Sequence, residues 1–215
     1  TGEAFAFIVR KNTFEPYTLQ RHEVNEYPLS REEAIQKVAA SLSAKDVIVS
    51  TTGMISRELF EYRTAQGQGH ERDFLTVGSM GHASQIALGI ALEKTDRRVW
   101  CFDGDGAALM HLGSVAIIAD KAPENFVHVI FNNGAHDSVG GQPTVGLKVN
   151  LAGIAKAAGY KDAVSVTTAE DLGSALKVLK TMRGPVLLEV RVHRGNRKDL
   201  GRPTTTPIQN RDALM

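Results

Sequence analysis

Residues 98–106 read RVWCFDGDG, a largely apolar stretch that runs directly into a turn with two glycines and two carboxylates. A strand with apolar residues on both faces is typical of a parallel sheet that helices cover on both sides. Residues 126–131, FVHVIF, repeat the pattern and also end in a polar turn, Asn132-Asn133-Gly134. Such sheets bind ligands at the carboxyl ends of their strands, so we expect the function to lie in these turns.

Predicted strands and helices alternate on both sides of this stretch. Strands are predicted over 46–50, 74–77, 98–102, 126–131, 163–166 and 185–192. Helices are predicted over 31–43, 55–63, 112–120, 151–158 and 169–182, with another that opens at 78–81 and ends near Lys94. Ser30 with Glu33 and Thr168 with Asp171 mark two helix starts. The expected fold class is α/β, a doubly wound, mainly parallel sheet with helices on both faces.

The two ends of the chain differ from this alternating part. Residues 4–10, AFAFIVR, predict a strand, and an isolated strand needs partners for its backbone groups. We therefore expect residues 1–29 to be the last strand of a preceding domain plus a linker, with an ordinary N-terminal arm as the alternative. Residues 30–193 are expected to form the ligand-binding domain, and 194–215 a surface tail.

Composition narrows the class of protein. The 215 residues carry 25 basic and 24 acidic side chains, a net charge of +1, which indicates neither a nucleic acid nor a membrane as partner. The single cysteine, Cys101, excludes an internal disulfide framework. No apolar run approaches the roughly 20 residues that span a bilayer. We expect a cytoplasmic protein that binds a small molecule.

The turn at Gly104-Asp105-Gly106 suggests a phosphate site, because a helix N-terminus and free backbone N–H groups attract anions. The glycine spacing of a dinucleotide fingerprint is not met, and a carboxylate would repel a diphosphate unless a divalent cation lies between them. Asn133, at the end of the next predicted strand, offers a second oxygen ligand at the same sheet edge. Asp and Asn oxygens suit Mg²⁺, which commonly bridges protein and phosphate.

Together these turns resemble the cofactor motif of the thiamine diphosphate-dependent decarboxylases and synthases. The resemblance implies a Mg²⁺ ion held by Asp105, Asn133 and the carbonyl of Ala135. It implies a thiamine diphosphate that contacts Thr51, Thr52, Gly53, Gly78, Ser79, Met80, Gly104, Gly106 and Ala107. Met80 would support the bent form of the cofactor, and the carbonyl of Gly78 would accept a hydrogen bond from the aminopyrimidine.

Within that superfamily, residues 7–14 and 131–144 most resemble the phosphonopyruvate decarboxylases, with the sulfopyruvate decarboxylases as near relatives. The resemblance implies decarboxylation of 3-phosphonopyruvate to phosphonoacetaldehyde and CO₂, by a homo- or hetero-oligomer. His136 is a candidate catalytic residue, while His82 and Asp137 are further candidates near the substrate. Candidates for the phosphonate are Lys148, Arg57 and the amides of Gly140 and Gly141.

One part of the family's machinery has no counterpart in the sequence. The glutamate that activates the aminopyrimidine belongs to a pyrimidine-binding domain, and Glu93, Glu124 and Glu189 do not lie in suitable loops. The chain is therefore expected to be the diphosphate-binding half, with the other domain in the same chain or in a partner. The alternatives are a β-type subunit of a split sulfopyruvate decarboxylase, an inert cofactor-binding module, and a nucleotide-binding oxidoreductase.

Overall fold

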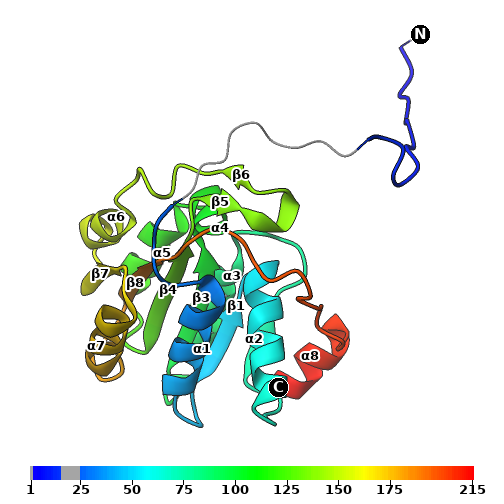
Figure 1. The fold of residues 1–215 in the computed structure, drawn as a ribbon. Helices are drawn as coiled ribbons and strands as arrows, with labels where there is room; N and C mark the ends of the chain where they lie inside the picture. Colours follow the sequence, from blue (N-terminus) through cyan, green and yellow to red (C-terminus); the bar gives the residue numbers. More distant parts are fainter. Residues whose placement is uncertain (1, 16–24) are drawn as a thin grey trace.

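The computed structural model describes residues 2–15 and 25–215, and in these residues a parallel sheet carries the fold (Figure 1). Its six strands have the order β2-β1-β3-β4-β8-β7. The strands are β1 (Val47–Ser50), β2 (Asp73–Leu75), β3 (Val99–Gly104), β4 (Phe126–Asn132), β7 (Asp162–Val166) and β8 (Val186–Arg191). All of their pairings are parallel, as the apolar strands predicted.

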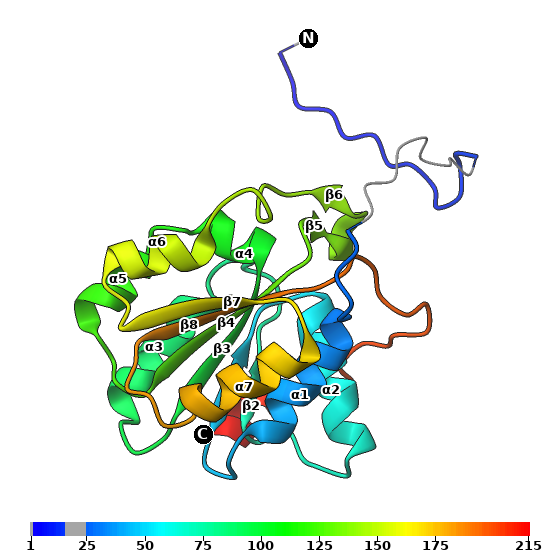
Figure 2. The same cartoon turned by 60° about the vertical axis from the view of Figure 1, so that its left-hand side comes forward.

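Helices cover both faces of the sheet, which confirms the doubly wound fold (Figure 2). One layer consists of α1 (Arg31–Ser41), α2 (Met54–Ala65) and α7 (Ala169–Leu179), and it packs on Trp100 and Phe102 of β3. The opposite layer consists of α3 (Ala83–Glu93), α5 (Ser114–Lys121) and α6 (Leu151–Ala158), and it packs on Cys101. Alternate residues of β3 thus enter two separate hydrophobic cores, so the strand must be apolar on both faces.

The strand order creates a switch point between β1 and β3. The chain leaves β1 through α2 on one face, and it leaves β3 through α4 (Asp105–Met110) and α5 on the other. When the chain leaves two adjacent parallel strands toward opposite faces of the sheet, a crevice remains at the carboxyl ends of those strands. The Gly104-Asp105-Gly106 turn lies at this crevice.

Two predicted helix starts have the expected capping bonds. The Ser30 hydroxyl accepts a hydrogen bond from the N–H of Glu33, whose carboxylate accepts one from the N–H of Ser30. Thr168 caps α7 by accepting from the N–H of Asp171. Each cap satisfies backbone donors that the first turn of a helix leaves free.

The two ends of the chain differ in local structure from the sequence prediction. Residues 4–10 form no strand: Phe7 and Ile8 are 94% and 96% exposed, and no neighbouring strand in the described residues satisfies this backbone. Part of the predicted linker, 16–24, lies outside the described residues. The predicted surface tail contains a helix, α8 (Pro207–Leu214), which packs beside β2. A capping box of Thr206 and Gln209 starts this helix, and proline at its first position favours it.

The segment between β3 and β4 also differs from the prediction. α5 matches the helix predicted over 112–120, but a separate helix, α4, precedes it and begins directly at Asp105. The loop after β4 carries a small antiparallel pair, β5 (Ala135–His136) and β6 (Gln142–Pro143), with the 3₁₀ turn η1 (Asp137–Val139) between them. Among the described residues, no helix has the length and apolar character to cross a membrane.

Candidate functional site

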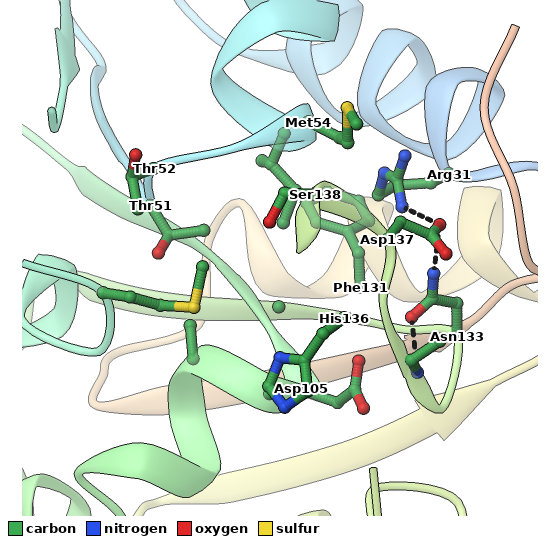
Figure 3. Close-up of a pocket in the computed structure, with 16 residues that line it drawn as sticks. Arg31, Thr51, Thr52, Met54, Asp105, Phe131, Asn133, His136, Asp137 and Ser138 are labelled. Atoms are coloured by element: carbon green, nitrogen blue, oxygen red, sulfur yellow. Dashed lines mark hydrogen bonds and ion pairs between the residues drawn. The ribbon is translucent and has the colours of Figure 1, made fainter. Parts of the chain in front are cut away.

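The loops after β1, β3 and β4 meet at the carboxyl edge of the sheet and line a pocket (Figure 3). The predicted site residues that line it are Thr51, Thr52, Met80, Gly104, Asp105, Gly106, Ala107, Asn133, Ala135 and His136. Gly53 lines a neighbouring cavity instead. Gly78 and Ser79, both in the described part of the chain, line neither of the two. The structure thus brings most of these residues together.

Asp105 is the first residue of α4, and its side chain is almost completely buried beside the loop that follows β4. Burial raises the pKa of this carboxyl, although the hydrogen bond from the Thr144 hydroxyl and the charge of His136 oppose the shift. A Cβ at Gly146 would lie only 2.5 Å from Oδ2 of Asp105, so glycine is required there for the loop to approach the carboxylate. The sequence did not reveal the contacts of Thr144 and Gly146.

Asn133 is held at both ends of its amide group. Its Oδ1 accepts a hydrogen bond from the N–H of Ala135 at 3.0 Å, and its Nδ2 donates to Oδ2 of Asp137 at 2.7 Å. Figure 3 shows the two bonds as dashed lines on either side of the Asn133 side chain. The amide therefore has a fixed orientation, with its oxygen on the Ala135 side and its nitrogen on the Asp137 side.

Asp137 is in turn fixed by a buried arginine. Nη1 of Arg31 donates to Oδ2 of Asp137 at 2.8 Å, while Nε and Nη2 of Arg31 bind the two carboxylate oxygens of Glu58. Burial opposes the charge of Arg31, but the hydrogen bonds and charges of Glu58 and Asp137 outweigh it and raise the pKa of Arg31. The arginine thus joins the start of α1 and the body of α2 to the loop after β4. The sequence analysis did not identify Arg31 or its role.

Thr51 and Thr52 bring β1 into the site. The hydroxyl oxygen of Thr51 is buried and has no hydrogen-bond partner in the part of the chain that the structure describes. A buried hydroxyl normally has a partner, so an acceptor bound in the pocket would satisfy it. The Thr52 hydroxyl accepts from the N–H of Gly78 at 3.3 Å, which brings the loop after β2 against the loop after β1.

Met80 and His136 also line the pocket. Met80 follows Gly78 and Ser79, which have φ angles of 75° and 46°, so a left-handed turn presents the thioether to the pocket. The imidazole of His136 packs on the backbone of Gly106, where a Cβ would approach it to 2.3 Å. Glycine at this position therefore lets His136 lie against the first turn of α4.

The other polar candidates from the sequence lie elsewhere or have other partners. The exposed His82 precedes α3, and its ring makes a tilted contact with that of His111. Glu189 is completely buried, and it accepts hydrogen bonds from Asn132 and Arg191 rather than lining the pocket. No glutamate lines the pocket within the described residues.

Comparison with known proteins identifies the family. Residues 51–190 match the thiamine pyrophosphate enzyme, C-terminal TPP binding domain, thiamine pyrophosphate being another name for thiamine diphosphate. The chain belongs to this family. The three loops that form the pocket all lie within the matched range. The family resemblance in the sequence is thereby confirmed.

Several decarboxylases are similar to this member of the family. The chain is 39% identical over 180 residues to a phosphonopyruvate decarboxylase of Streptomyces viridochromogenes, covering 84% of this chain and 44% of that protein. It is 39% identical over 152 residues to the sulfopyruvate decarboxylase subunit beta of Methanocaldococcus jannaschii, covering 70% of this chain and 77% of that subunit. The chain thus spans less than half the length of the phosphonopyruvate decarboxylase but most of the length of the beta subunit.

Solved structures of the same fold include two further decarboxylases. Benzoylformate decarboxylase from Polynucleobacter necessarius superposes with a TM-score of 0.66 at 17% identity, covering 80% of this chain and 34% of that chain. The 4-hydroxybenzoylformate decarboxylase of Rhodococcus jostii gives 0.65 at 21% identity, covering 82% and 35%. At this identity the likeness supports the fold alone.

The side chains of the pocket fit a magnesium diphosphate. Asp105, Asn133 and the backbone carbonyl of Ala135 offer only oxygen ligands, the type that Mg²⁺ prefers. The unpartnered hydroxyl of Thr51 is a donor for a phosphate oxygen.

Proposed function

We propose that this chain is the diphosphate-binding half of a thiamine diphosphate- and Mg²⁺-dependent decarboxylase of 2-oxo acids. The observation that carries the proposal is the meeting of Asp105, Asn133 and the unpartnered Thr51 hydroxyl in one pocket at the switch point of the sheet. Membership of the TPP-binding family supplies the cofactor class. The decarboxylases among its relatives support the reaction class.

Each loop then has a distinct task. Asp105, Asn133 and the carbonyl of Ala135 would hold Mg²⁺, and the threonines after β1 would donate hydrogen bonds to the diphosphate. The loop that contains Met80 would receive the organic part of the cofactor, and Met80 would support its bent form. When bound, thiamine diphosphate would supply a nucleophilic carbon and an acceptor for the electron pair that the departing CO₂ leaves behind. The protein binds and orients the reactants.

The proposed substrate is 3-phosphonopyruvate, which would yield phosphonoacetaldehyde and CO₂. The phosphonopyruvate decarboxylases of two Streptomyces species, at 39% and 40% identity, support this choice. One observation favours a second candidate, a subunit of a sulfopyruvate decarboxylase: the chain covers 77% of the length of a subunit beta but 44% of a phosphonopyruvate decarboxylase. Both substrates are 2-oxo acids with a tetrahedral oxyanion on the neighbouring carbon.

A second domain completes the site in this proposal. The pocket contains carboxylate and amide ligands but no glutamate among its described lining residues that would activate the aminopyrimidine. That acid would come from a pyrimidine-binding domain, in the same chain or in a partner, as part of a homo- or hetero-oligomer. His136, which lies against Gly106 at the pocket, would remain a candidate for proton transfer to the substrate.

The proposal is tested by assaying this chain with and without a pyrimidine-binding domain. We expect no CO₂ from 3-phosphonopyruvate with the chain, thiamine diphosphate and Mg²⁺ alone, because general acid–base assistance is absent and the cofactor lies open to water. Addition of the domain should restore turnover. Failure of the completed enzyme to release CO₂ from either 3-phosphonopyruvate or sulfopyruvate would contradict the proposed function.

A further inference from the structure

A second cavity, of about 430 Å³, adjoins the cofactor pocket. It lies between the start of α2, the loop after β2 and the C-terminal segment that leads into α8. Thr52, Met80 and Ser138 line both cavities, so the two spaces are neighbours across these side chains. A ligand in the second cavity would therefore lie beside the residue proposed to support the cofactor.

The charge of this cavity is entirely positive. Arg57 and Arg202 line it, and no carboxylate is among its described lining residues. In the part of the chain that the structure describes, neither guanidinium has an ion-pair or hydrogen-bond partner. Nearby arginines differ in this respect: Arg63 pairs with Asp73, and Arg197 pairs with Glu32.

The C-terminal segment that carries Arg202 is fixed in place. The N–H of the preceding Gly201 donates to Oε1 of Glu61 on α2 at 2.6 Å. On the other side, the Thr205 hydroxyl donates to the buried Asn210 of α8, and α8 packs beside β2. Arg202 therefore belongs to a segment that is held at both ends against the body of the domain.

We propose that Arg57 and Arg202 bind the tetrahedral oxyanion of the substrate, a phosphonate or a sulfonate, in this second cavity. The inference rests on the proposed function, because it places the keto carbon of the same substrate at the cofactor pocket. Guanidinium groups bind such oxyanions through paired, charge-assisted hydrogen bonds. Leu75, Val77 and Val139 supply the apolar part of the cavity lining.

This site differs from the other candidates that the sequence offered for the oxyanion. Lys148 is exposed and lines neither cavity, and the same holds for Gly140 and Gly141. Arg57 is the one of those candidates that the structure places beside the cofactor pocket. Arg202, in the predicted tail, has no sequence motif that would have identified it.

The test uses the complete enzyme, with its pyrimidine-binding domain, and the variants Arg57→Ala and Arg202→Ala. Each substitution should raise the KM for 3-phosphonopyruvate or sulfopyruvate by about 10- to 100-fold, because it removes a charge-assisted hydrogen bond to the oxyanion. The affinity for thiamine diphosphate should stay unchanged, so that a raised KM reports on binding of the substrate. Arg57→Lys should restore part of the loss. Arg211→Ala, which removes an exposed arginine whose ion pair in the described residues is with Asp212, is the matched control.

Binding of methylphosphonate, measured by calorimetry, separates this inference from the proposed function. Wild type and Arg211→Ala should bind this probe, and the two cavity variants should lose at least tenfold in affinity. If wild type binds methylphosphonate through both arginines but decarboxylates neither substrate, the oxyanion site stands and the proposed function is wrong. If methylphosphonate does not bind, or binds equally to all variants, the inference is wrong regardless of activity. The relative KM of the two substrates distinguishes phosphonate from sulfonate.

Discussion

Nδ2 of Asn133 donates to Oδ2 of Asp137 at 2.7 Å, and this bond fixes a proposed metal ligand from outside the metal site. The same carboxylate oxygen accepts from Nη1 of Arg31 at 2.8 Å and from the N–H of Gly195 at 3.1 Å. Three donors on one oxygen hold Asp137 in place, and Asp137 in turn holds the amide of Asn133. The orientation of the ligand thus depends on α1 and on the segment after β8.

Asp137→Ala should weaken Mg²⁺ binding without removing a ligand. The Asn133 amide would then be free to rotate, and loss of such outer contacts typically reduces metal affinity by about 10- to 100-fold. Mg²⁺ titration in the presence of thiamine diphosphate measures the effect in the complete enzyme. Asp137→Asn, which keeps an acceptor oxygen, should lose less. If Asp137→Ala binds Mg²⁺ as tightly as wild type, Asp137 does not position Asn133.

Arg31→Met should destabilise the fold. The substitution leaves Glu58 and Asp137 buried without their cationic partner, and breaking a buried pair in this way costs about 3–5 kcal/mol. Urea unfolding measures the change in the free energy of unfolding. Arg183→Ala, which removes an exposed pair with Glu124, is the control, and it should cost about 1 kcal/mol or less. Similar losses in the two variants would argue against a special role for the buried network.

Thr51→Val should separate stability from cofactor binding. The Thr51 hydroxyl is buried without a partner in the described residues, so its removal should leave the free energy of unfolding unchanged or raise it by up to about 1 kcal/mol. Affinity for the magnesium diphosphate cofactor should fall about tenfold, because one donor to the phosphate is lost. Thr51→Ser, which retains the hydroxyl, should bind as wild type. A variant Thr51→Val that binds the cofactor normally would show that the hydroxyl does not face the diphosphate.

Met80→Ala should lower turnover more than Met80→Leu. The proposed support of the bent cofactor is steric, and leucine keeps the bulk and apolar character that alanine lacks. Steady-state kcat of the complete enzyme measures the difference. Equal effects of both substitutions would reduce Met80 to an ordinary packing residue of the pocket.

The parts of the site that the sequence revealed are those with a local signal. Gly104-Asp105-Gly106 and Asn133 each follow an apolar strand, and parallel strands end at the same sheet edge, so their meeting required no knowledge of long-range contacts. The capping box of Ser30 and Glu33 is local for the same reason. Short spacing between residues and strand periodicity carry this information in the sequence itself.

The parts that the sequence did not reveal depend on contacts between distant segments. Arg31 binds Asp137 across 106 positions, and Thr144 binds Asp105 across 39. No periodicity links such residues, because only the packing of the finished fold brings them together. Residues 4–10 form no strand here for a related reason: apolar residues favour a strand, but a strand requires a neighbour to form.

The central claim is that this pocket binds thiamine diphosphate through Mg²⁺. The most direct test is calorimetry on the complete enzyme, which measures the affinity of the variants Asp105→Ala and Asn133→Ala for thiamine diphosphate in the presence of Mg²⁺. We expect Asp105→Ala to abolish binding of the cofactor, because it removes the carboxylate proposed to bind the metal. Asn133→Ala should weaken binding in a way that excess Mg²⁺ partly restores, and Asp120→Ala, which removes an exposed carboxylate on α5, should bind as wild type. Unchanged affinity in both site variants would contradict the assignment of this pocket as the cofactor site.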